Sequence, residues 1–211
     1  MRVEGKKVNF LGDSITEGAG ASCPENKYVE VFARKFSPAA ARNYGIGGTR
    51  IAKQTKPSEC ERYDRDFCTR LYEMDEDADI VVIFGGTNDY GHGDAPFGDF
   101  SDRTPDTFLG ACHYLMRGAI ERYPDATIVI MTPMHRAIEE QENRHSLYEY
   151  VEGIRACAEF YSIPVLDLYK NLGIQPQIEA HRVRFAPDGL HPNDRGAEKI
   201  VDMLGKFIEA L

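Results

Sequence analysis

The chain has 211 residues, enough for one domain with its own hydrophobic core. Lysine and arginine number 25 against 34 aspartates and glutamates, and the net charge of −9 disfavours nucleic acid and anionic membrane surfaces as partners. Five cysteines with no C-x-x-C pair indicate a reducing compartment, and no apolar stretch has the length of a signal peptide or a membrane span. We therefore expect one cytoplasmic domain over residues 1–211.

Strands and helices are predicted to alternate along the chain. Short apolar runs predict five strands, at residues 7–11, 41–44, 80–84, 127–131 and 163–168. Apolar residues at helical spacing predict helices at residues 25–36, 60–74, 106–122, 145–161 and 193–211. The 60–74 helix has only a thin apolar stripe and should face solvent, and Asn193 is suited to cap the last helix. This alternation predicts an α/β fold, a parallel sheet with helices on both faces.

Residues capable of catalysis follow the strands. Ser14, Gly48, Asn88 and His135 come after the first four strands in turn, and His191 precedes the last helix. Ligands bind beyond the carboxyl ends of the strands in an open parallel sheet. We therefore expect these residues to meet at one edge, although they are far apart in the sequence.

Their chemistry is that of nucleophilic catalysis. Ser14, in Gly-Asp-Ser, would be the nucleophile, and His191 the base that removes its proton. Asp188 lies three residues before His191 in a short turn and would orient the imidazole. The backbone N–H groups of Ser14 and Gly48 and the side-chain amide of Asn88 would supply the oxyanion hole.

Other residues compete for these roles or are expected to surround them. His135 is an alternative base, although the sequence shows no nearby carboxylate to orient it, and Asp167 is an alternative orienter. Asp13 should brace its own loop. Asp13, Tyr90 and His135 are also predicted to contact substrate, and the loop over residues 90–105 is predicted to form the pocket wall.

Four further histidines, His92, His113, His145 and His181, are interpreted as structural or exposed. Arg50 and Arg136 lie near the expected mouth of the site. Asp89, beside Asn88, should bond nearby backbone.

Four sequence motifs together resemble the four blocks of the SGNH hydrolase superfamily, also called GDSL esterases/lipases. They are Gly12-Asp13-Ser14, Gly48, Gly86-Thr87-Asn88-Asp89 and Asp188-x-x-His191. The resemblance implies a flavodoxin-like three-layer α/β/α sandwich with a five-stranded parallel sheet, and a Ser-His-Asp esterase that needs no metal or other cofactor. It gives Ser14, His191, Asp188, Gly48 and Asn88 the roles stated above. Gly48 fits the second block as Asn-x-Gly-x-x-Gly, and its neighbouring glycines leave the choice open by one position.

The predicted reaction is hydrolysis of short acyl esters, with acetyl on a sugar as the favoured case, and the partner is a small-molecule or carbohydrate ester. The 90–105 loop is short and polar and offers no long apolar lid for lipid chains. A lysophospholipase or thioesterase of the same fold, and a binding protein that has lost the chemistry, are the alternatives. A metal-dependent phosphoesterase is disfavoured because the sequence has no Asp-x-His or His-x-His pair. Gly-x-Ser-x-Gly and Walker A motifs are also absent from the sequence.

Overall fold

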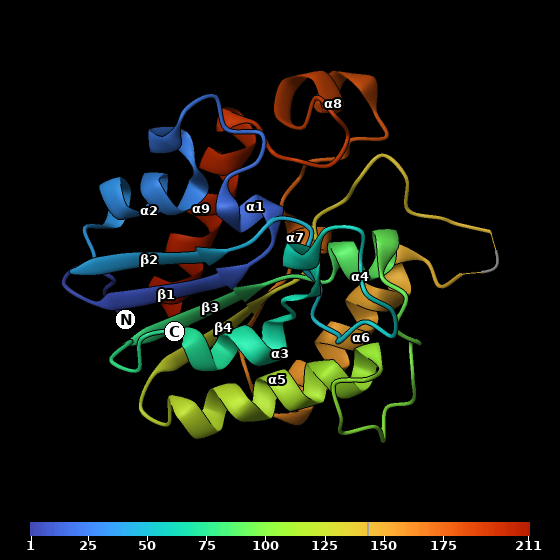
Figure 1. Cartoon of the computed structure of the whole chain (residues 1–211). Helices are drawn as coiled ribbons and strands as arrows, with labels where there is room; N and C mark the ends of the chain where they lie inside the picture. The colour runs from blue at the N-terminus through green and yellow to red at the C-terminus, as the bar shows by residue number, and fades with distance from the viewer. Residues whose placement is uncertain (143) are drawn as a thin grey trace.

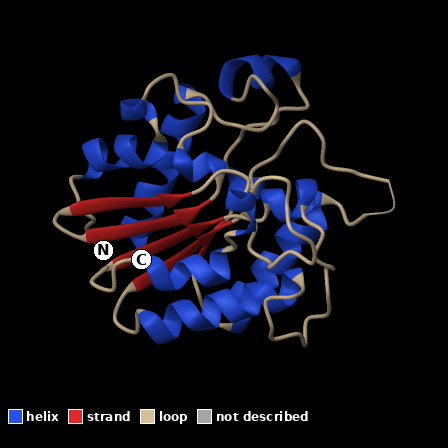
Figure 2. Cartoon of the chain, viewed as in Figure 1, coloured by secondary structure: helices blue, strands red, loops and turns tan. Residues whose placement is uncertain are grey.

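A five-stranded, all-parallel sheet forms the middle layer of the computed structural model, which describes residues 1–142 and 144–211. The strands are β1 (Lys7–Gly12), β2 (Ala40–Gly45), β3 (Ile80–Phe84), β4 (Thr127–Met131) and β5 (Val165–Leu166). Their order across the sheet is β2-β1-β3-β4-β5 (Figures 1 and 2). The strand order therefore reverses direction between β1 and β3, and the carboxyl ends of these two neighbouring strands lie side by side.

Helices cover both faces of this sheet. One face packs against α2 (Tyr28–Phe36) and α9 (Asp194–Ala210), and the other against α3 (Phe67–Arg70), α5 (Phe108–Arg122) and α6 (Leu147–Phe160) (Figure 1). Each face has its own hydrophobic core. Along β3, Ile80 and Val82 pack in the core with α2 and α9, whereas Val81 and Ile83 pack in the core with α3, α5 and α6. Such a strand is apolar throughout because both of its faces are buried. The predicted α/β/α sandwich is confirmed.

The remaining elements are short and lie at the ends of these layers. They are α1 (Ser14–Glu17), α4 (Thr87–His92), α7 (Leu168–Asn171), α8 (Glu179–Phe185) and the 3₁₀ turns Pro24–Asn26, Glu61–Asp64 and Leu71–Glu73. Within the part of the chain that the structure describes, no helix has the length and apolar character needed to cross a membrane. All five cysteines are free thiols.

The predicted solvent-facing helix at residues 60–74 is wrong. The segment breaks into a 3₁₀ turn, α3 and a second 3₁₀ turn, and Phe67, Leu71 and Met74 are buried in the core. Asp66 stops a continuous helix because its side chain caps α3 by accepting from Thr69 N at 2.8 Å. The break leaves the first turn of the segment free to face the carboxyl edge of the sheet.

Other predicted boundaries also differ from the structure. The helix expected at residues 25–36 is a 3₁₀ turn, Pro24–Asn26, followed by α2. The strand expected at residues 163–168 pairs only over Val165–Leu166, because Asp167 turns the chain and caps α7 by accepting from Lys170 N. Residues 90–92 belong to α4 rather than to the loop predicted for 90–105.

Candidate active site

Ser14 lies where β1 turns sharply into α1. The Asp13 carboxylate caps this short helix by accepting from Ile15 N at 3.0 Å, as the sequence predicted for a bracing residue. Gly12 allows the turn, since a β-carbon there would lie 1.9 Å from Thr16 Oγ1. As the first residue of α1, Ser14 has a backbone N–H with no partner inside the helix. The hydroxyl and this N–H are therefore both available at the strand end.

Asp188 and His191 occupy the loop between α8 and α9. The Oδ1 atom of Asp188 accepts from the backbone N–H groups of Leu190 and His191 at 2.9 and 2.7 Å, and Oδ2 lies 2.6 Å from His191 Nδ1. Burial raises the pKa of Asp188, but the hydrogen bonds from the His191 side chain and the two amides outweigh it and hold this pKa below its usual range. The carboxylate therefore stays ionised and keeps a proton on His191 Nδ1.

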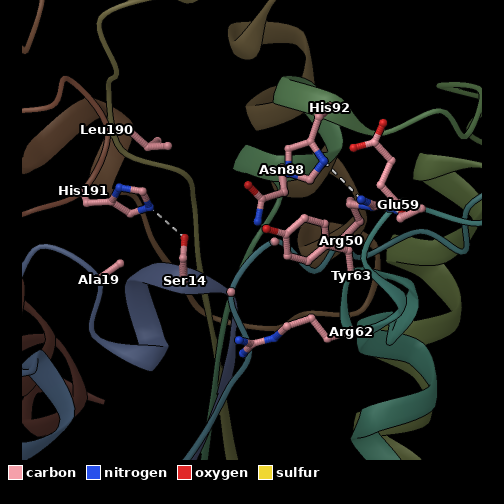
Figure 3. A pocket seen from close by; sticks show the side chains of 13 residues that line it. Ser14, Ala19, Arg50, Glu59, Arg62, Tyr63, Asn88, His92, Leu190 and His191 are labelled. Atoms are coloured by element: carbon pink, nitrogen blue, oxygen red, sulfur yellow. Dashed lines mark hydrogen bonds between the residues drawn. The ribbon is translucent and has the colours of Figure 1, made fainter.

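The third contact joins the two segments. His191 Nε2 lies 2.9 Å from Ser14 Oγ, across 177 residues of sequence (Figure 3). With the proton on Nδ1, Nε2 carries a lone pair and accepts from the serine hydroxyl. Ser14, His191 and Asp188 thus form one continuous hydrogen-bonded chain that can take the serine proton as the oxygen attacks an electrophile.

The glycine loop after β2 offers one amide to the same place. Gly45 N donates to Asn43 Oδ1 at 2.8 Å, and Gly47 N donates to Glu17 Oε2 at 2.6 Å. Gly48 N donates to none of the residues that the structure describes. Gly48 has φ +79°, and the ring of Tyr63 covers it so closely that a β-carbon would lie 2.3 Å from ring carbons. Both facts favour glycine at this position.

Asn88 stands at the beginning of α4, after β3. Its Nδ2 atom donates one hydrogen bond to Thr49 O at 3.0 Å, which fixes the amide and leaves its second hydrogen free. Asp89, the next residue, accepts from Ile51 N and Ala52 N, both at 2.9 Å, so its predicted backbone role is confirmed. Burial raises the pKa of Asp89 to about 6.

A cavity of about 730 Å³ opens over these groups. Figure 3 shows Ser14, His191, Ala19 and Leu190 on one side of it, Asn88 in the middle, Arg50, Tyr63, Glu59 and His92 across from them, and Arg62 along the bottom of the view. In the described ranges, 1–142 and 144–211, no group of three or more His, Cys, Asp or Glu side chains is placed to hold a metal ion. The chemistry on offer here is that of a serine hydroxyl and hydrogen-bond donors.

Comparison with known proteins shows the family of the chain. The model of the GDSL-like Lipase/Acylhydrolase family matches residues 10–199. The chain belongs to this family. The match confirms the resemblance to SGNH hydrolases, and the family is one of ester hydrolases.

Solved structures of the same fold include a protein from Lactobacillus plantarum, with 28% identity, 99% of each chain covered and a TM-score of 0.87. A lipase/acylhydrolase from Enterococcus faecalis has 21% identity over 100% of this chain and 96% of its own, with a TM-score of 0.69. A variant of an acetyl-xylooligosaccharide esterase from Geobacillus has 20% identity over 99% and 96%, with a TM-score of 0.65. No curated protein matches the chain significantly.

The structure places three residues that were expected to contact substrate outside the cavity. Asp13 is 2% exposed, and its carboxylate caps α1 by accepting from Ile15 N. Tyr90 is 1% exposed and packs in the core, because α4 turns it inward, away from the cavity. His135 is not among the cavity residues, since its ring packs on Tyr169 with centroids 3.8 Å apart. None of these side chains reaches the cavity.

The two alternative catalytic residues are engaged elsewhere. The sequence argument that His135 lacks a carboxylate is wrong, because Glu139 Oε1 lies 2.8 Å from its Nδ1. This pair is nevertheless tied to Tyr169, whose hydroxyl donates to Glu139 Oε2 at 2.8 Å. Asp167 binds Arg155 and Thr132.

The pocket wall is the part that the sequence assigned wrongly. Residues 93–105 do not line the cavity, and only His92 comes from the segment predicted to do so. Ser58, Glu59, Arg62 and Tyr63 line it instead. The one feature of the sequence that could have indicated this wall is Tyr63, which lies among charged residues ahead of the capping Asp66. The helical spacing of the residues that follow obscured it. His92 was interpreted as structural or exposed; it binds Arg50 and also borders the cavity.

Proposed function

We propose that the protein is a serine esterase that hydrolyses short acyl esters, acetyl esters above all, through an acyl-Ser14 intermediate. One observation carries this proposal: the unbroken chain from Asp188 through His191 to the Ser14 hydroxyl, with contacts of 2.6 and 2.9 Å. A serine hydroxyl is a weak nucleophile until a base takes its proton, and this arrangement supplies the base in the required tautomer.

In the proposed reaction, Ser14 Oγ attacks the ester carbonyl while its proton moves to His191 Nε2. The negative charge that develops on the carbonyl oxygen is met by Ser14 N–H, Gly48 N–H and the free hydrogen of Asn88 Nδ2. His191 then gives its proton to the departing alcohol oxygen, which leaves acetyl on Ser14. A water molecule, deprotonated by the same histidine, attacks the acyl-enzyme and releases the acid and free serine.

The composition of the cavity supports a short acyl group. Glu59 and Arg62 are charged side chains that border the cavity, and a long alkyl chain laid against them would strip water from these groups at a cost in free energy. The likeness to an acetyl-xylooligosaccharide esterase agrees with an acetylated small molecule or carbohydrate as the substrate. The proposal extends that activity to this chain by analogy of fold.

The test is hydrolysis of p-nitrophenyl esters from acetate to long-chain acyl, with the wild type beside Ser14→Ala and His191→Ala. We expect cleavage of acetate, a steep fall with chain length, and loss of activity in both variants by about 10³-fold or more. An alkyl phosphonate should label Ser14, as seen by peptide mass spectrometry, and leave Ser14→Ala unlabelled.

Other outcomes point to the alternatives. Preference for long chains would replace the short-acyl proposal with a lysophospholipase or thioesterase activity. An inactive wild type that resists the phosphonate would indicate a binding protein of the same fold. Full activity in Ser14→Ala would refute the assigned nucleophile.

A further inference from the structure

His92 reaches the cavity from the end of α4, on the side across from Ser14 and His191 (Figure 3). Its Nδ1 atom lies 3.1 Å from Arg50 Nη1. A guanidinium group has only donors, so it donates to Nδ1, and Nδ1 must hold a lone pair. The ring proton therefore resides on Nε2. The contact with arginine thus selects one tautomer of His92.

Arg50 is itself a fixed part of the protein. Its side chain is only 3% exposed, and Nη2 donates to Ser58 Oγ at 2.8 Å and lies 3.4 Å from Asp64 Oδ1. Asp64 also accepts from Ser58 N and Ser58 Oγ. Partial burial and the charge of Arg50 lower the pKa of His92, so the ring is neutral near pH 7. His92 is accordingly a neutral N–H donor held in place from behind.

Tyr63 completes the same side of the cavity. Its ring packs over Gly48 and its centroid lies 6.0 Å from that of His92. Figure 3 shows its hydroxyl pointing toward Ser14 and Asn88. The hydroxyl can donate and accept, and Glu59, a further cavity residue, adds acceptor oxygens. This wall therefore offers both donors and acceptors.

The positive charges of the wall are balanced within the protein. Arg50 faces Asp64, and Arg62 donates to Glu17 at 2.8 Å. A carboxylate or phosphate on the substrate would compete with these partners and meet Glu59. A neutral hydroxyl can instead pair with the His92 N–H, the Tyr63 hydroxyl and the Glu59 carboxylate. Burying a polar group of the wall against an alkyl or aryl alcohol would leave it without a partner.

We infer that His92 and Tyr63 form a subsite for the hydroxyl groups of a neutral, polyhydroxylated alcohol, so that the substrate is an acetyl ester of a sugar rather than of an alkyl or aryl alcohol. This inference rests on the proposed esterase function. It assigns the alcohol preference to two residues outside the triad and the oxyanion hole.

Three variants of His92 separate its donor from its packing. His92→Gln places an amide donor near the Nε2 position, His92→Asn places one only near Nδ1, and His92→Phe keeps the ring without nitrogen. We expect kcat/KM on an O-acetylated xylooligosaccharide, divided by kcat/KM on p-nitrophenyl acetate, to fall about tenfold in the Phe and Asn variants, as for one lost hydrogen bond. Gln should restore most of it. Tyr63→Phe should lower the same ratio, and His145→Asn, outside the cavity, serves as the control.

A binding experiment separates this inference from the proposed function. The dissociation constant of the acetylated xylooligosaccharide is measured on Ser14→Ala, alone and combined with His92→Phe or His92→Gln. Binding that weakens with His92→Phe and recovers with His92→Gln supports the subsite, even if the wild type hydrolyses nothing. Lack of hydrolysis would refute the esterase proposal without refuting the subsite. Absence of binding at millimolar concentration, or equal losses on both substrates, overturns the subsite. A ¹⁵N NMR spectrum must also show the Nε2–H tautomer for His92; an Nδ1–H ring overturns it.

Discussion

Glu17 joins the glycine loop to the cavity wall, and its removal should slow catalysis. One carboxylate oxygen accepts from Gly47 N at 2.6 Å, and the other accepts from Arg62 Nη2 at 2.8 Å. The peptide between Ile46 and Gly47 is therefore held in place. The next peptide carries the Gly48 N–H, which borders the cavity and has no acceptor among the described residues. Burial raises the pKa of Glu17, but the bonds from Arg62 and Gly47 N outweigh it and keep this pKa below its usual range.

The size of the effect follows from the exposure of these contacts. The Glu17 and Arg62 side chains are 41% and 49% exposed, so their ion pair contributes well under about 1 kcal/mol. The bond to Gly47 N is charge-assisted and is worth roughly 1.5 kcal/mol at this exposure. If all of it orients the Gly48 amide toward the oxyanion, Glu17→Ala lowers kcat about tenfold. Complete loss of one oxyanion donor, about 10²- to 10³-fold, is the upper limit.

Steady-state kinetics on p-nitrophenyl acetate would test this reasoning. Glu17→Gln keeps a neutral acceptor for Gly47 N and should lose only a fewfold in kcat. Arg62→Ala leaves the bond to Gly47 in place and should lose less still, so it is the matched control. A Glu17→Ala enzyme with unchanged kcat, or an Arg62→Ala enzyme as slow as Glu17→Ala, would refute the proposed positioning of the oxyanion loop.

Two predictions concern stability. Gly48→Ala should lower the free energy of unfolding, because φ +79° costs an L-residue about 1–2 kcal/mol and the new methyl group meets the Tyr63 ring. In urea unfolding, adding Tyr63→Ala should restore the part of this loss that comes from the steric clash. Strictly additive effects of the two substitutions would contradict the close packing. Burial raises the pKa of Asp13 to about 6, above the unfolded value of 3.8, so the folded state keeps a proton that the unfolded chain loses and stability falls as pH rises from about 4 to 6. Asp13→Asn, which still caps α1, should therefore match the wild type near pH 4 and exceed it above pH 6 by at most about 3 kcal/mol; a constant difference across this range would contradict the assignment.

Segments whose own sequence dictates their structure were predicted well. The apolar runs at 80–84 and 127–131 are strands buried on both faces, as their short length and β-branched residues favour. Asn193 caps α9 by accepting from Arg195 N and Gly196 N, both at 3.1 Å, as its position before an amphipathic run predicted. In these places local propensity and tertiary packing agree.

The pocket wall could not be predicted because tertiary contacts decide it. Residues 60–74 carry helical spacing, but Arg70 turns inward and donates to Gly12 O, Tyr44 O and Thr49 Oγ1. This buried side chain ties the ends of β1 and β2 to α3, the helix that follows the segment carrying Tyr63. No periodicity along the chain reveals a contact between segments that far apart. The family motifs place the residues after each strand, whereas the wall belongs to no motif.

The buried charges show where this fold gives up stability. The described residues include six charged side chains that are almost fully inaccessible: Asp13, Arg50, Asp66, Arg70, Asp89 and Glu139. Burial raises the pKa of Asp13 and of Asp89 to about 6 and lowers that of Arg70 to about 10, so the ionised form of each is disfavoured where it stands.

Three of these charged groups hold the loops that carry the proposed site: Asp13 caps the helix of Ser14, Asp89 binds the backbone at Ile51 and Ala52, and Arg70 binds Gly12 O. Apolar residues in place of these charged side chains would avoid the free energy of burying a charge, but they would leave these backbone groups without partners. The carboxyl edge of the sheet is therefore the region where substitutions should stabilise the fold and impair the proposed chemistry together.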